Sequence, residues 1–519
     1  MILLSSTTVL YSCGLALSWW LYGRLRERRD NPNGLPLPPG PKGYPIIDNL
    51  LDFPTYKPWL VYDKWSKTYG DIVYFKVLGQ PFIILGSVQR TYDLFERRSS
   101  NYSDRNRMPM LRELMNWTWN MAFMPYGTWW RRHRRTFHDH FHPNIVHKYY
   151  SLQVQTTRAF LRRLSMSPND FMLHVRHAFT STIMQIAYGI EIADDDDEYT
   201  ITAEKALNSL AEVGNPGSFL VDLFPVMKYI PAWFPGAGWK KKANYWRHLS
   251  GVFINKAWNV AKKQFKEGAA EPCMATTMIE GMSDESSPDR ATEELLARNV
   301  CAVTFAGGAD TTVSTIQSYF MAMSLYPEVQ KKAQEELDRV LGNRLPEFDD
   351  RPNLPYISAM VKESMRWQVV TPLAAPHMAS NADEYEGYYI PKGTILIGNA
   401  WSILHDPEVY KDPLTYNPER FLKDGKIDPK ARDPTVASFG FGRRICPGRY
   451  FAENSMFILI SHLLAVYDIR PGLDKDGKEI PIKPEMTNGI LSYPEPFSCR
   501  ITPRSKRAEE LIRNSDLLD

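Results

Sequence analysis

The stretch that decides the fold of this chain is a ten-residue loop near its carboxyl end, FGFGRRICPG at residues 439–448. It fits the pattern F-x-x-G-x-R-x-C-x-G, which a chain of 519 residues would match by accident on the order of once in several thousand chains. Cys446 lies just before an apolar helical pattern that opens at Gly448 and Arg449. Backbone amides and the positive end of a helix dipole at such a place stabilise a thiolate. The loop therefore predicts a metal-binding thiolate.

The neighbours of Cys446 suit a flat, anionic cofactor. Gly442 and Gly448 lack a side chain, so they let the backbone approach such a cofactor closely. Arg444 offers a planar fork of donors for a carboxylate. A thiolate pushes electron density onto a haem iron and favours cleavage of the oxygen–oxygen bond. A lone cysteine is more often a buried structural thiol, but that interpretation would leave these neighbours unexplained.

The loop resembles the ligand loop of the cytochrome P450 family. The resemblance implies a mainly α fold with a small β component, in which a helical prism encloses haem b (iron protoporphyrin IX). Cys446 is then the axial ligand of the iron, and Phe439, Arg444 and Gly448 contact the cofactor. The resemblance covers nearly the whole chain and is greatest to fungal microsomal members of specialised metabolism. Further segments that carry it are Pro38-Pro39-Gly40-Pro41, Tyr388 to Gly393, and His405-Asp406-Pro407.

A second motif lies in an apolar helical pattern over residues 293–326. Two adjacent glycines, Gly307 and Gly308, cost about 1 kcal/mol each relative to alanine inside a helix. Such a pair permits a local distortion, and here it would leave a groove for dioxygen and substrate. Asp310 and Thr311 follow, and the resemblance implies that they relay protons to the oxygen. Elsewhere, Asp and Thr inside helices often bond only backbone or water.

Two more motifs are assigned to the scaffold and to the haem propionates. Glu363 and Arg366 lie three residues apart on one helical face, a pairing worth about 0 to 1 kcal/mol at a surface. The family's E-x-x-R motif instead buries this pair with Arg420, as a structural brace for the cysteine loop. Trp130 and Arg134 resemble the family's W-x-x-x-R clamp for a propionate, and His377 resembles a second propionate partner.

The remaining charged residues indicate which partners the protein has. The net charge of +3 is too even for a nucleic-acid binder. The sequence has no flavin or nicotinamide phosphate-binding fingerprint, so we expect electrons from NADPH through a separate flavoprotein, NADPH–cytochrome P450 reductase. Surplus cations could form its docking patch, although a solvated face is the ordinary interpretation. These cations are Arg131, Arg132, Arg135 and Arg443.

The expected reaction is insertion of one oxygen atom of O2 into a small lipophilic substrate, by hydroxylation or epoxidation. The residues that match the family's pocket-lining segments are Trp117, Phe123, Phe305, Ala306, Val370, Leu373 and Ile490. They predict an apolar pocket for a terpenoid or related secondary metabolite, although core packing explains the same residues equally well. The alternatives are a haem-thiolate isomerase or dehydratase that needs neither O2 nor reductase, and a non-catalytic haem sensor.

The ends of the chain predict a membrane-bound enzyme. Residues 1–22 are expected to form a transmembrane signal anchor, because residues 2–21 carry no charge and match the thickness of a bilayer core. Aromatic and then basic residues follow, whereas a cleaved signal peptide would have basic residues first. Residues 23–45 form a basic, proline-rich stalk, residues 46–504 the monooxygenase domain, and residues 505–519 a charged tail. We expect a single-pass protein of the endoplasmic reticulum membrane with a cytosolic catalytic domain.

One apolar segment is open to two interpretations. Residues 214–239 alternate Pro and Gly with Phe, Leu, Ile and Trp. They are too apolar for an ordinary solvated loop and too interrupted for one long helix. The segment either touches lipid or folds as short helices into the core.

Overall fold

The computed structural model describes residues 14, 18, 29–194, 197–214 and 218–515. The helices and strands up to residue 280 are α2 (Pro58–Tyr69), β1 (Ile72–Val77), β2 (Gln80–Leu85), α3 (Val88–Thr91), η1 (Tyr92–Arg97), α4 (Ser99–Tyr102), η2 (Met110–Leu114), η3 (Trp117–Trp119), α5 (Thr128–Phe141), η4 (Val146–Tyr149), α6 (Tyr150–Met166), η5 (Pro168–Asp170), α7 (Phe171–Tyr188), α8 (Glu198–Val213), α9 (Leu220–Leu223), η6 (Pro225–Tyr229), α10 (Gly238–Lys266) and α11 (Met274–Glu280).

The elements after residue 280 are α12 (Arg290–Gly308), α13 (Thr311–Leu325), α14 (Pro327–Leu341), η7 (Phe348–Asn353), α15 (Pro355–Trp367), β3 (His377–Met378), β4 (Asp383–Tyr385), β5 (Tyr388–Ile390), β6 (Ile395–Gly398), α16 (Ala400–Leu404), η8 (Pro418–Phe421), β7 (Leu422–Lys423), β8 (Lys426–Ile427), α17 (Thr435–Ser438), η9 (Gly442–Arg444), α18 (Arg449–Val466), β9 (Tyr467–Pro471), β10 (Cys499–Pro503) and α19 (Lys506–Arg513). The predicted mainly helical class with a small β component is confirmed.

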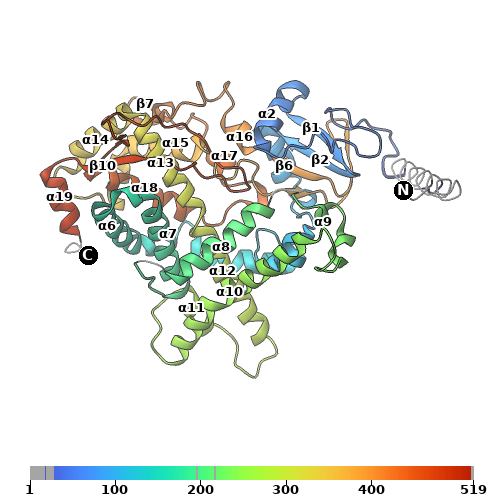
Figure 1. Ribbon diagram of the computed structural model, residues 1–519, viewed down its shortest axis with the longest axis horizontal. Coiled ribbons are helices and arrows are strands. Elements are labelled where there is room, and N and C mark those ends of the chain that lie inside the picture. Colours follow the sequence, from blue (N-terminus) through green and yellow to red (C-terminus); the bar gives the residue numbers. More distant parts are fainter. Residues whose placement is uncertain (1–13, 15–17, 19–28, 195–196, 215–217, 516–519) are drawn as a thin grey trace.

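A four-stranded sheet lies with α2 at one end of the molecule (Figure 1). Its order is β1-β2-β6-β3, with β1 antiparallel to β2, β2 parallel to β6, and β3 antiparallel to β6. His377 lies in β3, the edge strand of this sheet, and is buried.

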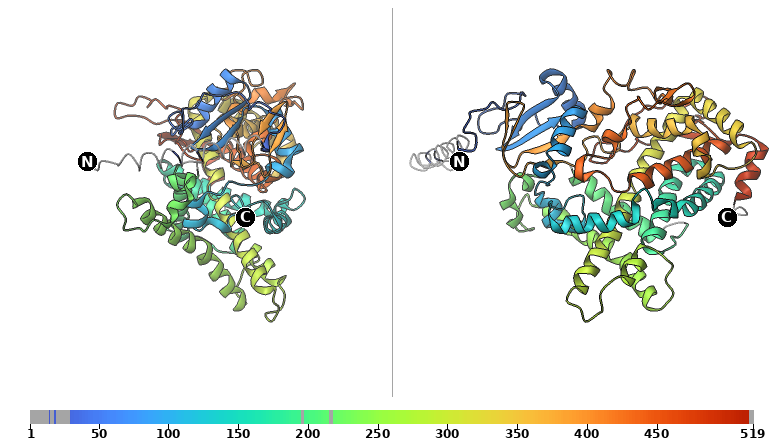
Figure 2. Two further views of the ribbon diagram at one scale, coloured as in Figure 1. Left: turned by 90° about the vertical axis from the view of Figure 1, so that its right-hand side faces the viewer. Right: turned by 180° about the vertical axis from the view of Figure 1, so that it is seen from behind.

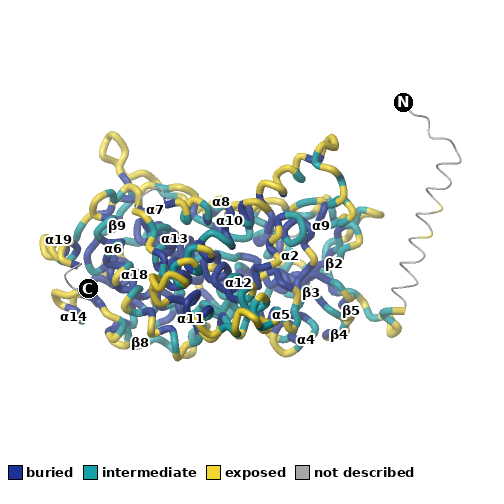
Figure 3. Tube along the Cα trace, turned by 90° about the horizontal axis from the view of Figure 1, so that it is seen from below, coloured by how far each residue is buried: buried dark blue, intermediate teal, exposed yellow. Residues whose placement is uncertain are grey.

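The helices enclose two large apolar cores. One lies among α5, α7, α8, α10 and α12, and the other among α6, α13, α14, α15 and α18. α13 and α18 are buried on nearly every side, as expected for helices that are apolar all round. Figure 2 shows these helices from two further sides, and Figure 3 shows buried chain concentrated around α12 and α13, with exposed loops at the periphery. The centre of the body therefore lies where the glycine pair was found.

The helical pattern over residues 293–326 forms two helices. α12 ends at Gly308 and α13 begins at Thr311, with Asp310 at the junction in a non-helical conformation (φ −136°). A Cβ on Gly308 would lie 2.6 Å from Cγ1 of Ile183 on α7, so the two helices cross too closely for any side chain there. By contrast, a Cβ on Gly307 would meet no atom within 4 Å. The predicted distortion is thus a break in the helix, and Gly307 faces open space.

The structure describes little of the amino-terminal end of the chain and most of the carboxyl-terminal end. The predicted anchor at residues 1–22 lies, apart from Gly14 and Ser18, outside the described residues. Within the described part of the chain, no helix has the length and apolarity needed to span a bilayer. At the other end, the sequence predicted only a charged tail, but residues 506–513 form α19, whose Ala508 and Ile512 are buried against the helical body.

Residues 214 and 218–239 form short helices, as one interpretation predicted, whereas contact with lipid stays a prediction. They include the short helices α9 and η6, and Val221 is buried in the core. Several large apolar side chains nevertheless face solvent, among them Trp233, which is 79 % exposed. The segment lies at the same end of the molecule as the four-stranded sheet (Figures 1 and 2).

Candidate functional site

A cavity of about 360 Å³ lies between α12 and the cysteine loop. Cys446 lies in its wall, together with Phe439, Gly448 and Phe451 around it. The rest of the wall includes residues of α7, α8, α12, α13 and the carboxyl-terminal loop between β9 and β10: Ile183, Leu207, Leu210, Val303, Ala306, Gly307, Thr311, Ile490 and Leu491. The cavity thus brings together the two motifs that the sequence placed more than a hundred residues apart.

The cysteine loop is shaped by short backbone contacts. The Cys446 N–H donates to the Phe439 carbonyl at 2.8 Å, which closes the loop. Gly442 has a positive φ of 54°, and a Cβ on it would lie only 2.0 Å from the carbonyl oxygen of Phe95. The prediction for this glycine is therefore corrected: Gly442 allows close approach to η1. Gly448, in contrast, does line the cavity.

The electrostatics of the Cys446 thiol differ from the prediction. Burial raises the pKa of this thiol, although the Gly448 N–H, Arg134 and Arg449 each act to lower it. The helix terminus and its amides are present, but they do not outweigh burial. A bound metal cation deprotonates a coordinating thiol outright. The site is consequently built for a thiolate that forms on metal binding.

Three guanidinium groups line the same cavity. Arg105 donates to the carbonyl oxygens of Ala122, Ala375 and Pro376, and Arg444 to those of Ser103, Met121 and Met124. Arg134 has neither a hydrogen bond nor an ion pair among the described residues. Burial lowers the pKa of Arg105, Arg134 and Arg444, the last to about 10.

The charge of these three arginines indicates whether the cavity suits haem b. Arginine stays protonated in proteins, and a buried charge without an opposite charge is costly. No carboxylate of a described residue forms an ion pair with any of the three arginines, although the Asp104 carboxylate attracts Arg105 and Arg444 from a greater distance. A cofactor that carries two propionates would supply that missing charge, while Cys446 supplies the iron ligand. The residues present therefore fit haem b.

Sequence reasoning missed Arg105. This residue precedes the predicted pocket segment and belongs to none of the motifs that carried the resemblance. The only feature near Arg105 in the sequence that could have marked it is Asp104, whose carboxylate accepts a hydrogen bond from the Arg105 backbone N–H at 2.8 Å. Only the fold brings its guanidinium to the cavity, where it donates to the carbonyl oxygen of Ala375, 270 residues away in the sequence.

Trp130 and His377 also lie in the cavity wall. The Trp130 indole N–H donates to the Met121 carbonyl at 3.2 Å, and its ring stacks on the Arg444 guanidinium. The Nδ1 atom of His377 lies 2.6 Å from the Tyr102 carbonyl, which can only accept, so Nδ1 carries the proton. Burial lowers the His377 pKa well below its usual value. Because Nδ1 makes this bond, Nε2 is the ring nitrogen left for a cofactor group, and the role of His377 towards a propionate stays a prediction.

Asp310 and Thr311 lie on different sides of the helix break. Thr311 lines the cavity and donates to the Gly307 carbonyl at 2.8 Å. Asp310 is absent from the cavity wall and forms an ion pair with Arg176 of α7 at 2.9 Å. The Tyr493 hydroxyl is a further hydrogen-bond partner. Burial raises the Asp310 pKa against the lowering effects of Arg176 and Tyr493, neither of which any sequence motif had indicated.

Four of the seven predicted pocket residues line the cavity, namely Phe123, Ala306, Val370 and Ile490. The other three do not, and here the prediction is corrected. Trp117 and Phe305 belong to an aromatic stack with Trp119 and Phe253, in which the Phe253 and Phe305 rings are 4.9 Å apart. Leu373 packs in the apolar cluster of the sheet. All three are apolar, as pocket residues are, but they pack in the core.

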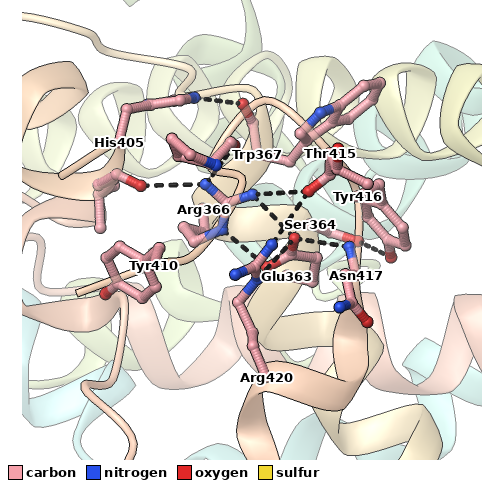
Figure 4. Close-up of polar contacts among 12 residues, drawn as sticks. Glu363, Ser364, Arg366, Trp367, His405, Tyr410, Thr415, Tyr416, Asn417 and Arg420 are labelled. Carbon is pink, nitrogen blue, oxygen red and sulfur yellow. Dashed lines mark hydrogen bonds and ion pairs between the residues drawn. The ribbon is translucent and has the colours of Figure 1, made fainter. Parts of the chain in front are cut away.

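The predicted brace brings Glu363, Arg366 and Arg420 together (Figure 4). Glu363 and Arg366 are both 0 % exposed and form two hydrogen bonds of 2.8 Å, and Arg420 reaches Glu363 at 3.2 Å. The Asn417 N–H also donates to Glu363, at 2.8 Å. Arg366 donates in addition to the carbonyl oxygens of Leu404, Pro413 and Thr415. The brace thus ties α15, which packs on α18, to η8 and the segment before it.

Comparisons with known proteins agree with this geometry. A family model described as Cytochrome P450 matches residues 38–500. A cytochrome P450 monooxygenase of Coprinopsis cinerea, COX1, is 43 % identical over 98 % of this chain and 99 % of its own length. A second one from the same fungus, COX2, is 46 % identical over 97 % of this chain and 94 % of its own length. Tryptamine 4-monooxygenase of Psilocybe cyanescens is 39 % identical, over 91 % and 93 % of the two chains.

Proposed function

This chain belongs to the cytochrome P450 family and is a monooxygenase, and we propose that it hydroxylates or epoxidises an uncharged lipophilic substrate of terpenoid type. Haem b, when bound, activates dioxygen for insertion of one oxygen atom. Two electrons from NADPH, delivered by a separate flavoprotein reductase, and two protons complete the stoichiometry, and the second oxygen atom leaves as water. The observation that carries the proposal is the wall of the cavity opposite Cys446.

That wall supports an uncharged substrate. Apart from Cys446, Ser438, His377 and the three arginines, the residues of the cavity are mostly aliphatic or aromatic, and their polar groups are threonine hydroxyls and one asparagine. Among the described residues, the cavity wall includes neither aspartate nor glutamate. A cationic amine such as tryptamine, after which one relative is named, would enter without a counter-charge, and burying an unpaired charge is costly. A neutral hydrocarbon skeleton has no such cost.

The proposal is tested by incubating the full-length protein with NADPH, a cytochrome P450 reductase and two sets of candidates. Sesquiterpene hydrocarbons form one set, and tryptamine with related arylalkylamines forms the other. We expect products that have gained one oxygen atom from 18O2 only in the first set. Oxidation of the amines with no oxidation of the terpenes would contradict the proposed substrate class.

We propose that Asp310 and Thr311 bring protons to the cavity, because Thr311 lines it and Asp310 lies directly behind. Asp310→Asn keeps the shape of the side chain but removes its acid, so product formed per NADPH consumed is expected to fall by about 10²-fold. Hydrogen peroxide release measures the diverted electrons. Asp222→Asn is the matched control, because Asp222 is a half-buried acid whose pKa burial raises to about 7, but it lies on α9. Equal coupling in both variants would rule out this role.

We propose that the reductase docks on a basic patch formed by Arg131, Arg132, Arg135 and Arg443, which are all exposed. Arg131 and Arg443 both stack on the Tyr126 ring, which joins α5 to the cysteine loop. The double change Arg131→Glu, Arg443→Glu is expected to raise the KM for reductase by about tenfold at low salt, with the difference shrinking as salt rises. Arg500→Glu, at an exposed position on β10, is the control. Equal KM values for the two variants would contradict this docking surface.

We propose that the protein lies on the cytosolic face of the endoplasmic reticulum membrane and dips an apolar surface into it. This surface contains Leu220, Phe224, Val226, Tyr229, Trp233 and Phe234, and it continues over Tyr44, Ile46, Leu51 and Tyr56, all of which are exposed. Leu223 joins the two segments, because it packs on the cluster that also includes Leu50 and Phe53. Lys228 and Lys240 lie within or next to it, as suits anionic lipid headgroups.

An environment-sensitive dye tests this orientation. Attached to Trp233→Cys in the full-length protein, the dye is expected to shift its emission to the blue in phosphatidylcholine–phosphatidylserine vesicles. The same dye at Met166→Cys, an exposed apolar position at the end of α6, should report water. Identical emission from the two sites would contradict the proposed surface.

A further inference from the structure

The end of α8 and the carboxyl-terminal loop meet in a contact that leaves no room for a side chain. Gly214 follows α8, and its N–H donates to the Leu210 carbonyl at 2.8 Å. A Cβ on Gly214 would lie 2.5 Å from Cγ2, 2.9 Å from Cβ and 3.0 Å from Cδ1 of Ile490. Ile490 lines the cavity, whereas Gly214 does not. Gly214 therefore supports this part of the cavity wall from behind.

The backbone that carries Ile490 is held on both sides. Residues 487–493 form a tight hairpin, in which the Thr487 N–H donates to the Tyr493 carbonyl at 2.7 Å. The Ser314 hydroxyl of α13 and the Ser492 carbonyl lie 2.5 Å apart, and the Ser492 N–H donates to the Val370 carbonyl at 2.8 Å.

The preceding residues are held as well. The Asn488 amide donates to the Thr55 carbonyl at 3.0 Å. A Cβ on Gly489 would lie 3.0 Å from the Leu491 carbonyl oxygen and 3.7 Å from that of Ala211, so this residue is close to α8 too. The hairpin is thus fixed, and Ile490 cannot retreat with it.

We infer that Gly214 is a specificity-determining residue, which sets the size of the substrate by the position it allows Ile490. The side chain of Ile490 is branched at Cβ and stiff, so a methyl group at position 214 cannot be absorbed by a small rotation. The overlap is greatest with Cγ2 of Ile490 and includes its Cβ, so it reaches close to the backbone. The side chain must move away from α8, towards the cavity. Glycine at position 214 therefore keeps the cavity wide enough for a bulky polycyclic molecule.

This inference rests on the proposed function only in taking the cavity for the substrate site. Because Gly214 acts through Ile490, it is a positioning residue. Its effect must depend on ligand size and must vanish when Ile490 is shortened. A purely structural role for Gly214 would affect small and large ligands alike.

Optical titration of the full-length haem protein tests the inference with three imidazoles of increasing bulk: imidazole, 1-phenylimidazole and clotrimazole. Gly214→Ala is expected to leave the Kd of imidazole within about twofold of wild type and to raise that of clotrimazole about tenfold, the scale of overpacking by a methyl group. Equal weakening of all three ligands would overturn the inference. So would unchanged binding of clotrimazole, which would mean that α8 had shifted instead.

A double-mutant cycle identifies the partner. Ile490→Ala in the Gly214→Ala background is expected to return the clotrimazole Kd to within about threefold of the Kd of Ile490→Ala alone. Failure of this rescue contradicts the assigned contact. Gly251→Ala is the matched control, because a Cβ at this position of α10 would meet no atom within 4 Å. Its Kd values should equal those of the wild type for all three ligands.

Two further results keep the test decisive. Should Gly214→Ala yield no folded haem protein, Ile490→Phe narrows the same wall from the cavity side. This variant must then discriminate against clotrimazole, and if it binds all three ligands like the wild type, the inference is wrong. If even the wild type shows no spectral shift with imidazole, the proposed haem function has failed and the inference falls with it. A size-dependent loss confined to the variants supports the inference.

Discussion

Glu363→Ala is expected to lower the free energy of unfolding by about 3–5 kcal/mol, and with it the amount of haem that the protein retains. The change leaves Arg366 buried at 0 % exposure without a counter-ion, and it also removes the acceptor of Arg420 and of the Asn417 N–H. Natural domains are stable by only about 5–15 kcal/mol, so this loss is a large fraction of the total. Thermal unfolding followed by circular dichroism, with haem content measured in parallel, gives both quantities.

The control for this prediction is a pair with the same spacing at the surface. Arg507 and Glu510 also lie three residues apart and form an ion pair of 2.9 Å, but their side chains are 52 % and 55 % exposed. Glu510→Ala is expected to change stability by about 0.5 kcal/mol or less. The two variants therefore compare one contact in two environments. If Glu363→Ala is as stable as Glu510→Ala, the brace has no structural role.

Cys446→Ser is expected to abolish oxygen insertion while leaving the fold intact. The backbone bond from residue 446 to the Phe439 carbonyl does not need sulfur, and serine fills nearly the same space. The hydroxyl is a far weaker ligand than a thiolate and gives the iron less electron density. Product formation with the wild-type substrate, and the ferric absorption spectrum, are the measurements.

Cys273→Ser distinguishes the ligand from a cysteine that is merely buried. Cys273 caps α11, with its sulfur 3.5 Å from the Thr276 N–H, and a serine hydroxyl is a good substitute for this cap. The activity and the ferric absorption spectrum of Cys273→Ser should match those of the wild type.

For the first variant, Cys446→Ser, persistent oxygen insertion would rule out Cys446 as the ligand.

The sequence predicted the parts of the site that depend on local pattern. The helix after Cys446 is Arg449–Val466, as expected, because its apolar residues and the glycine before it are local signals. The Glu363–Arg366 pair was visible as a three-residue spacing within one helix. A local distortion was expected at the two adjacent glycines, but the sequence predicted one helix where the structure has two. Each of these features needs only a few neighbouring residues.

What the sequence did not predict comes from contacts between distant segments. Arg105, Arg176 and Tyr493 belong to no local motif, and only the packed fold brings them to Ala375 and Asp310. Trp117 and Phe305 show the converse, because apolar residues look alike whether they line a cavity or fill a core. The pKa of Cys446 depends on how deeply the loop is buried. No single-sequence pattern contains that information.

The central claim is that Cys446 ligates a haem iron as a thiolate. The most direct measurement is the absorption spectrum of the full-length protein after reduction with dithionite and addition of carbon monoxide. We predict the strongly red-shifted Soret band that distinguishes thiolate-ligated haem from haem ligated by histidine. A band at the unshifted position, or a protein without bound haem, would contradict the account.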